Sequence, residues 1–368
     1  MDLAVKLLAV ILLVGTCAFG QTVPASRPAF VMDGKSFVPW GFNYDRDFKL
    51  RLIEDYWETE WPTVEQDFRE MKQLGANIVR VHLQFGRFMD GPEKINEKSL
   101  ARLAALVKLA EETGLYLDLT GLGCYRKTDV PAWYDQLPEQ QRWDQQARFW
   151  ETIASRCAKS PAIFCYDLIN EPVVPVQKVD TWLDPHELAG FSYVQFIVKD
   201  LRGRKREDVA RAWVHQMCAA IRKRDPNRLI TIGMLPFPGA GGGSGFDPRD
   251  MASELDFFSV HIYPASGKLD ESLNLLADFD SHGKPVVVEE IFPLAASAVE
   301  LEQFIRDAWA RGHASGWIGF YWGQTPDELR QSNEIIDRFM LSWLDLFQKL
   351  GPELTGTRQG AATSPHKL

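Results

Sequence analysis

The sequence predicts a single (β/α)8 barrel, also called a TIM barrel, in which eight parallel strands close into a ring with helices around it. Three observations support this prediction. Strand-like apolar runs alternate with helical patterns from residue 36 to residue 350, turn residues precede several of these runs, and two runs end in a glutamate. Alternating strands and helices are typical of a parallel sheet, and eight such units favour a closed barrel over an open sheet.

The expected strands are short runs rich in Val, Ile, Leu and Phe. They cover residues 37–42, 77–83, 115–120, 163–169, 229–233, 257–262, 285–289 and 317–322. Helices are expected where apolar residues recur three or four positions apart, over residues 63–74, 97–113, 140–158, 207–224, 269–281 and 298–311. Gly75, Gly114 and Gly283 each lie just before an expected strand, where a helix would end.

An open doubly wound sheet is the alternative fold. It ordinarily carries a glycine-rich phosphate-binding turn after its first strand, whereas charged and aromatic residues follow Tyr44 here. The glycine-rich run 238–245 fails the G-x-G-x-x-G spacing, lacks the Walker lysine and is not G-x-S-x-G, because Phe246 occupies the last place. We expect that run to be a flexible loop.

Charge and composition exclude some classes of function. The 368 residues carry a formal charge of −9, which argues against binding nucleic acid through its phosphates, and 45% hydrophobic content suits a large core. Neither a C-x-x-C pair nor an H-E-x-x-H motif is present, so we expect no metal and no cofactor. We also expect a monomer.

Both ends of the chain are predicted to lie outside the catalytic domain, which we place at residues 21–350. Residues 1–20 have one early lysine, an apolar run at 7–14 and a small-residue cleavage site, as in a signal peptide, so the protein is expected to be secreted or periplasmic. The apolar run is too short to span a bilayer. Lipoprotein anchoring at Cys17 is the less favoured alternative, because Thr16 precedes it. Residues 351–368 are predicted to be a flexible tail.

Four cysteines remain after the predicted cleavage: Cys124, Cys157, Cys165 and Cys218. Export would permit disulfides, and four cysteines allow three pairings. Cys157 and Cys165 are close in sequence, but a turn between a helix and a strand separates them. Free, buried thiols are an equally good interpretation.

The longest insertion is expected after the fourth strand, at residues 173–206. It contains Trp182, Phe191, Tyr193 and Phe196, and it would lie over the catalytic face of the barrel. Its aromatic residues either shape a substrate cleft or simply pack together to cover the barrel.

Glu171 and Glu290 are the candidate catalytic residues. Each closes an apolar strand, and the carboxyl ends of the strands in a (β/α)8 barrel surround the active site. Two carboxyl groups facing one cleft are the minimum requirement for cleaving a glycosidic bond. Glu289 is the rival to Glu290, since adjacent strand residues point to opposite faces and the sequence does not show which points inward.

The motifs around both glutamates resemble glycoside hydrolase family 5, the cellulase and β-mannanase family of retaining (β/α)8 enzymes. The similarity covers about residues 37–347 and lies in Asn170-Glu171-Pro172 and in the 284–291 segment. It implies that Glu171 is the acid/base, that Glu290 is the nucleophile and that Asn170 holds the hydroxyl beside the anomeric carbon.

Other positions match the same family. The resemblance implies that Arg80 and Tyr263 contact the nucleophile, that His261 lies in the site, and that Trp322 forms a platform for the sugar. Trp317 is expected to be core. Asn43, Tyr44 and His82 are further candidates for the cleft, although each is also compatible with a structural role. Thr120 departs from the pattern, because many members carry histidine there.

The main functional hypothesis is a secreted retaining hydrolase of β-linked oligo- or polysaccharides, in particular an endo-acting β-mannanase or β-glucanase. It predicts carboxyl groups about 5–5.5 Å apart. An exo-acting β-glycosidase is the alternative if the 173–206 insertion closes one end of the cleft. A non-hydrolytic carbohydrate-binding barrel has less support, because both acids are present. A metal-dependent hydrolase built on His82, His261 and a carboxylate also has less support, because the sequence contains no H-x-H spacing.

Overall fold

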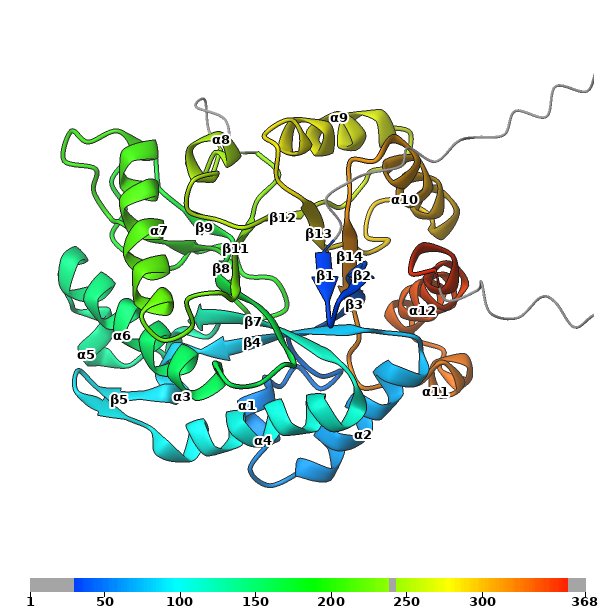
Figure 1. Cartoon of the computed structure of the whole chain (residues 1–368), viewed down its shortest axis with the longest axis horizontal. Helices are drawn as coiled ribbons and strands as arrows, with labels where there is room; N and C mark the ends of the chain where they lie inside the picture. The colour runs from blue at the N-terminus through cyan, green and yellow to red at the C-terminus, as the bar shows by residue number, and fades with distance from the viewer. Residues whose placement is uncertain (1–29, 238–242, 357–368) are drawn as a thin grey trace, which may run out of the picture.

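The computed structural model describes residues 30–237 and 243–356, and its centre is a closed parallel barrel (Figure 1). Neighbouring strands follow chain order around the ring, which confirms the predicted (β/α)8 fold. The barrel strands are β3 (Trp40–Tyr44), β4 (Ile78–Gln84), β7 (Tyr116–Gly123), β8 (Ile163–Asn170), β11 (Leu229–Met234), β12 (Phe258–His261), β13 (Val286–Glu290) and β14 (Gly316–Phe320).

Helices surround this barrel (Figure 1). They are α1 (Ile53–Tyr56), α2 (Trp61–Gln73), α3 (Phe85–Phe88), α4 (Glu97–Thr113), α5 (Ala132–Asp135), α6 (Glu139–Cys157), α7 (Arg206–Arg222), α8 (Pro248–Met251), α9 (Leu269–Asp280), α10 (Ala298–Arg311), α11 (Pro326–Gln331) and α12 (Ile335–Leu354), with a 3-10 turn at Lys127–Asp129. No helix in the described part of the chain is both long and apolar enough to cross a bilayer.

Local sequence explains how several of these helices begin and end. At α10, Ser297 accepts from the backbone of Glu300 while the Glu300 carboxylate accepts from the backbone of Ser297, which is a capping box. The helix ends at Gly312 with φ 77°, in the left-handed region that glycine adopts readily. At α4 the Asn96 side chain accepts from the backbone of Ser99 and the helix ends at Gly114 with φ 66°, so the predicted ends at residues 113 and 311 are confirmed.

The first barrel strand differs from its prediction. Residues 37–42 were expected as one strand, but β1 (Phe30–Met32) and β2 (Lys35–Phe37) form a separate hairpin, and the barrel strand starts at Trp40. Pro39 lies between them and lacks the backbone N–H that a continuous ladder needs. Phe30 and Phe37 pack against Phe164 at 5.0 and 5.5 Å between ring centroids, at the end of the barrel where the strands begin.

The core contains the residues that the strand pattern predicted to be inside. Trp317 is fully buried between Trp40 and Trp309, so its core assignment is confirmed. The four cysteines Cys124, Cys157, Cys165 and Cys218 are free and buried, which leaves none of the three pairings formed. Burial raises the pKa of the Cys124 thiol to about 11, so this thiol is unreactive near neutral pH.

The insertion after β8 crosses the end of the barrel where the strands terminate. It contains the short pair β9 (Pro172–Val173) and β10 (Gln195–Phe196), while another short pair, β5 (Met89–Gly91) and β6 (Lys94–Ile95), follows β4. α12 continues to Leu354, so the predicted tail boundary at residue 350 is four residues early. The predicted signal peptide with Cys17, most of the glycine-rich run and residues 357–368 lie outside the described residues.

At Gly319 in β14 the packing leaves no space for a side chain. A Cβ atom there would lie 1.9 Å from Cζ2 of Trp343, a fully buried residue of α12 whose indole donates to the Phe320 carbonyl. We expect Gly319→Ala to lower the free energy of unfolding by about 1–3 kcal/mol through overpacking. Thermal or chemical denaturation followed by tryptophan fluorescence measures the effect.

Gly91→Ala in β5 is the matched control. The nearest atom to an added Cβ is Cβ of Lys94 at 3.6 Å, an ordinary contact. Its cost is expected to stay within about 0.5 kcal/mol. Equal losses from the two variants would contradict the packing described for β14 and α12.

Candidate active site

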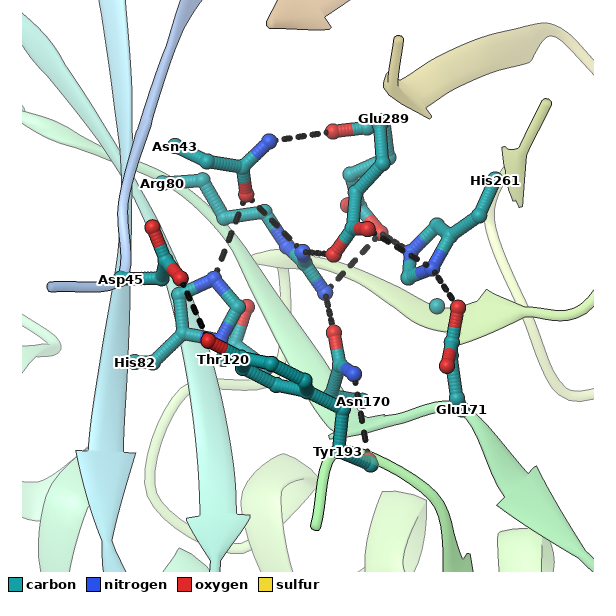
Figure 2. Close-up of polar contacts among 12 residues, drawn as sticks. Asn43, Asp45, Arg80, His82, Thr120, Asn170, Glu171, Tyr193, His261 and Glu289 are labelled. Atoms are coloured by element: carbon teal, nitrogen blue, oxygen red, sulfur yellow. Dashed lines mark hydrogen bonds and ion pairs between the residues drawn. The ribbon is translucent and has the colours of Figure 1, made fainter. Parts of the chain in front are cut away.

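Glu171 stands at the end of β8 in an unusual backbone conformation. Its φ is +44°, in the left-handed region that non-glycine residues rarely adopt, and its N–H is held by the carbonyl of Gly233 in β11 at 2.9 Å. Such conformations cost energy and tend to occur at functional sites. The side chain is 14% exposed and reaches His261, whose Nδ1 is 2.9 Å from Oε1 of Glu171 (Figure 2).

The structure separates the two adjacent glutamates of β13. Glu290 lines the cavity at the barrel end, where its Oε1 accepts from Arg80 at 2.8 Å and its Oε2 from the hydroxyl of Tyr263 at 2.6 Å. Glu289 is fully buried inside the barrel and accepts from Ser259 at 2.9 Å. The register between β12 and β13 shifts before His261, so the two carboxylates do not simply alternate in and out. Only Glu290 can meet a substrate.

Glu171 and Glu290 converge on one point, as their positions in the sequence suggested. One carboxylate oxygen of each and one ring nitrogen of His261 all lie within 4.8 Å of one another. A short separation of this kind is typical of retaining glycosidases, whereas inverting enzymes keep their carboxyl groups about 6.5–9.5 Å apart to admit a water molecule.

Arg80, on β4, is completely buried and ties the site together (Figure 2). Its guanidinium donates to Glu290, to Oδ1 of Asn170 at 3.0 Å and to Asp167 at 2.6 Å. The expected contact with the predicted nucleophile is therefore present. Asn170 in turn donates from Nδ2 to the backbone carbonyl of Tyr193, so its amide orientation is fixed from both sides.

Burial and charge have opposite effects on Glu290. Burial raises the pKa of this carboxyl group above its usual range, while His261, Arg80 and the Tyr263 hydroxyl lower it. Arg80 lowers the pKa of Glu290, as expected, but the effect of burial is larger. Burial lowers the pKa of His261, but the nearby carboxylates, among them Glu290 and Glu171, together have a larger effect and raise it to about 10. The ring is therefore cationic at neutral pH.

A second group of acids lies below the site, in the barrel interior. Asp118, Asp167 and Glu289 bring carboxylate oxygens within 4.8 Å of one another. Burial and the negative charges of Glu289 and Asp167 hold the pKa of Asp118 far above its usual range. Burial and Glu289 also raise the pKa of Asp167 to about 6. Arg80, which lies 2.6 Å from Asp167 and 3.5 Å from Glu289, neutralises part of this charge.

Hydrogen bonds fix the tautomer of His82. Asn43 donates from Nδ2 to the Glu289 and Gly319 carbonyls, so its Oδ1 is an acceptor, shared by Arg80 at 2.9 Å and His82 Nε2 at 3.2 Å. Burial lowers the pKa of His82 well below its usual value, so the ring is neutral and carries its proton on Nε2. Nδ1 then accepts from the hydroxyl of Tyr125, a residue that the sequence did not indicate.

The structure contradicts the prediction that Tyr44 faces the cleft. It was a candidate for the cleft, but it points outward from β3 towards the helices, where it is buried and bonded to Asp67 and Tyr56. Strand alternation explains this, because the neighbouring Asn43 points inward. Asn43 itself is fully buried beneath the cavity, whereas His82 lines it.

A cavity of about 540 Å³ opens above Glu171 and Glu290. Trp322 lines it, as expected, together with Tyr263, Phe292, Tyr193 and one residue that the sequence did not indicate, Asp45. Asp45 follows Tyr44 directly, and a charged residue just after a strand end was the available signal. Tyr193 belongs to the 173–206 insertion, which therefore contributes to the cleft wall as well as packing its own aromatics.

Thr120 does not reach the cavity. It is fully buried and donates to Asp167 at 2.7 Å, the same carboxylate to which Arg80 donates. Thr120 therefore supports the site from beneath and does not line the cavity.

Two sets of side chains could offer ligands to a metal: Glu171 with His261 and Glu290, and the three interior acids. In the first set His261 donates to Glu171, and both Glu290 oxygens accept from Arg80 and Tyr263. In the second set Arg80 forms ion pairs with Asp167 and Glu289. The positive charge of Arg80 thus lies against both sets.

Tyr263→Phe tests the hydrogen bond to Glu290. A hydrogen bond to an ionised group contributes about 1.5–3 kcal/mol, so its loss should reduce kcat/KM by about 10- to 100-fold. As the predicted nucleophile, Glu290 must be ionised to attack, so activity is expected to fall as pH drops through its pKa. Because the tyrosine hydroxyl lowers that pKa, its removal should move the acidic limb of the pH–rate profile to higher pH. A loss of activity with no shift of the limb would contradict this role.

Comparisons with known proteins agree with the geometry. The family model for cellulases, glycosyl hydrolase family 5, matches residues 41–324. A protein of Oryza sativa subsp. japonica named mannan endo-1,4-β-mannosidase 9 is 24% identical over 286 residues, which are 67% of this chain and 62% of the rice protein. The chain thus spans about three-fifths of that relative's length.

A second relative and one solved structure complete the comparison. Mannan endo-1,4-β-mannosidase A of Podospora anserina is 26% identical over 321 residues, 75% of this chain and 74% of that protein. The structure of an exo-β-1,4-mannosidase from Opitutaceae bacterium strain TAV5 superposes with a TM-score of 0.64 at 18% identity, covering 91% of this chain and 63% of that one, and so supports the fold. The family match, which extends from β3 to beyond β14 and includes both glutamates, leads to one conclusion: the chain belongs to glycosyl hydrolase family 5.

Proposed function

We propose that this protein hydrolyses β-1,4-mannosidic bonds with net retention of anomeric configuration. The observation that supports this most directly is the approach of Glu171 and Glu290 to within 4.8 Å across one cavity. In the first step the Glu290 carboxylate attacks the anomeric carbon and a glycosyl-enzyme ester forms, while Glu171 gives its proton to the departing oxygen.

In the second step a water molecule replaces the leaving group. Glu171, now ionised, takes a proton from this water, which attacks the anomeric carbon and releases Glu290. Tyr263 and Arg80 hold Glu290 in place at 2.6 and 2.8 Å throughout. His261 contacts Glu171 at 2.9 Å and orients its carboxyl group in both steps.

The choice of mannose rests on the two relatives, both of which are named for β-1,4-mannan cleavage. β-Glucan is the second candidate substrate, since the matched family is also that of the cellulases. Reducing-sugar release from galactomannan, glucomannan, β-glucan and xylan, together with aryl β-glycosides, discriminates between them. Turnover of mannosides that Glu171→Gln and Glu290→Gln both abolish is expected. Preference for β-glucan, or no turnover on any β-linked substrate, would overturn the proposal.

We also propose that the protein is exported. The support is the composition of residues 1–20, with a lysine, an apolar run and a small-residue site before Gln21. Expression of the full chain followed by mass spectrometry of the product should find a mature N-terminus near Gln21. An intact N-terminus in the cytoplasm would contradict export.

A further inference from the structure

The loops that follow three barrel strands meet at one carboxylate in the cavity wall. Tyr193, from the insertion after β8, donates its hydroxyl proton to Oδ2 of Asp45 at 3.1 Å. Trp322, after β14, donates from its indole to Oδ1 of the same residue at 3.2 Å. Asp45 itself follows β3, and Figure 2 shows Tyr193 reaching across to it. Tyr193 and Asp45 therefore form a bridge across this side of the cavity.

This bridge is firmly supported. The backbone carbonyl of Tyr193 accepts from Asn170 at 3.3 Å, and its ring packs on Tyr125 with 4.9 Å between centroids. Next to it, the N–H of Ser192 donates to the carbonyl of Tyr125 at 2.8 Å. Tyr125 in turn contacts His82 on the cavity floor. The wall is thus attached to residues that also form the catalytic site.

Asp45 has the properties of a binding group. Its side chain is only 5% exposed, although it lines the cavity, and burial of a carboxylate is costly unless it serves as an acceptor. Each oxygen receives one donor, from Tyr193 or Trp322, and each carboxylate oxygen can accept two. The remaining acceptor capacity suits the hydroxyl groups of a sugar.

The lining of the cavity combines buried polar residues with exposed apolar ones. Asp45, Arg46 and Tyr193 line the cavity, with the Arg46 guanidinium 4.0 Å from the Trp322 ring centroid. The lining also includes apolar side chains that are more than two-fifths exposed, namely Phe48, Leu50, Leu188, Leu294 and Ile336. A sugar whose anomeric carbon lies between Glu171 and Glu290, and which rests on Trp322, would direct its far hydroxyls towards Asp45.

We propose that the cavity accepts only the non-reducing terminal sugar of a chain, that cleavage is therefore exo, and that Asp45 is a specificity-determining residue that binds the hydroxyls of that sugar. A chain extending past the terminal ring would collide with the bridge between Asp45 and Tyr193. This inference rests on the proposed mannoside hydrolysis and favours the exo alternative that the sequence left open over endo cleavage.

The products from a capped oligosaccharide test the cleavage mode. Mannopentaose reduced with borohydride marks the reducing end, and mass spectrometry during the first few per cent of turnover identifies the fragments. Exo cleavage from the other end should yield free mannose and reduced mannotetraose together. Early reduced mannobiose or mannotriose would overturn the exo inference while leaving mannoside hydrolysis intact. No cleavage of this or any other mannoside would instead overturn the proposed function.

Two variants test the role of Asp45. Asp45→Asn replaces one acceptor by a donor and should lower kcat/KM on aryl β-mannosides by about 30- to 100-fold, mainly through a higher KM, since a site built to bind hydroxyls rejects poorly matched partners. Tyr193→Phe removes only the bridging hydroxyl and should lower kcat/KM by about 3- to 10-fold. The second variant keeps the test valid if Asp45→Asn does not fold.

Tyr116→Phe is the matched control. Its hydroxyl donates to Asp33 at 2.8 Å, the same kind of Tyr–Asp bond, but it lies at the start of β7, far along the strand from the cavity. Its kcat/KM should stay within about 2-fold of the unmodified protein. A folded Asp45→Asn or Tyr193→Phe variant that behaves like this control would overturn the assignment of Asp45.

Discussion

Replacing Glu290 with alanine is expected to lower kcat by at least about 10⁴-fold, the largest effect of any single substitution in this chain. The variant lacks the group that forms the covalent intermediate, and neither the Tyr263 hydroxyl nor Arg80 can replace it. Removing the side chain also leaves space on that face of the sugar. A small external anion such as azide should therefore attack there and restore turnover on an activated aryl β-mannoside.

The product identifies the residue. Azide entering in place of Glu290 yields an α-mannosyl azide, because a single displacement inverts the β configuration. Glu289→Ala serves as the comparison, since Glu289 is buried in the barrel interior and azide cannot reach the sugar from its position. Rescue of Glu289→Ala by azide, with near-normal activity in Glu290→Ala, would reverse the assignment between the two neighbours.

Replacing Glu171 with alanine is expected to have an effect that depends on the leaving group. A substrate with a poor leaving group needs the proton from Glu171, and its rate of glycosyl-enzyme formation should fall by about 10²- to 10⁴-fold. A dinitrophenyl mannoside needs no such proton, so it should form the intermediate almost normally, and the intermediate should accumulate because no base activates water. Stopped-flow detection of a burst, followed by slow turnover, measures both effects.

Azide again provides a distinguishing product. In Glu171→Ala it should attack the accumulated intermediate from the β face and yield a β-mannosyl azide, the opposite anomer to that from Glu290→Ala. Equal losses on good and poor leaving groups, without a burst, would mean that Glu171 does not act as the acid/base.

Much of this site follows from sequence because its chemistry is placed at strand ends. A (β/α)8 barrel fixes the direction of each strand, so an acid that closes an apolar run must lie on the catalytic face, as Glu171 and Glu290 do. The barrel, its strand order and the burial of Trp317 could be predicted for the same reason.

Side-chain direction was harder to predict where the strands are irregular. A one-residue shift beside His261 places both Glu289 and Glu290 on the inner side of the barrel, at different depths, and simple alternation does not anticipate this. Tyr44 obeyed alternation and pointed outward. Local pattern therefore identified glutamates that the structure brings together at the cavity, but it could not rank the residues around them.

The contacts that long loops make could not be predicted from the sequence. Tyr193 and Asp45 are 148 positions apart, and no periodic pattern links an insertion to the loop that it touches. The interior pairing of Thr120 with Asp167 is equally non-local and became visible only in the folded barrel. Tyr193 and Asp45 line the cavity, so its shape could not be predicted from the sequence.

The stereochemistry of the first product tests the central claim most directly. Proton NMR during rapid hydrolysis of an aryl β-mannoside, recorded before mutarotation, shows which anomer is released. Double displacement through Glu290 and Glu171 predicts that β-mannose appears first and that α-mannose follows only as the sugar equilibrates. Initial release of α-mannose would show a single displacement by water and would contradict the assignment of Glu290 as the nucleophile.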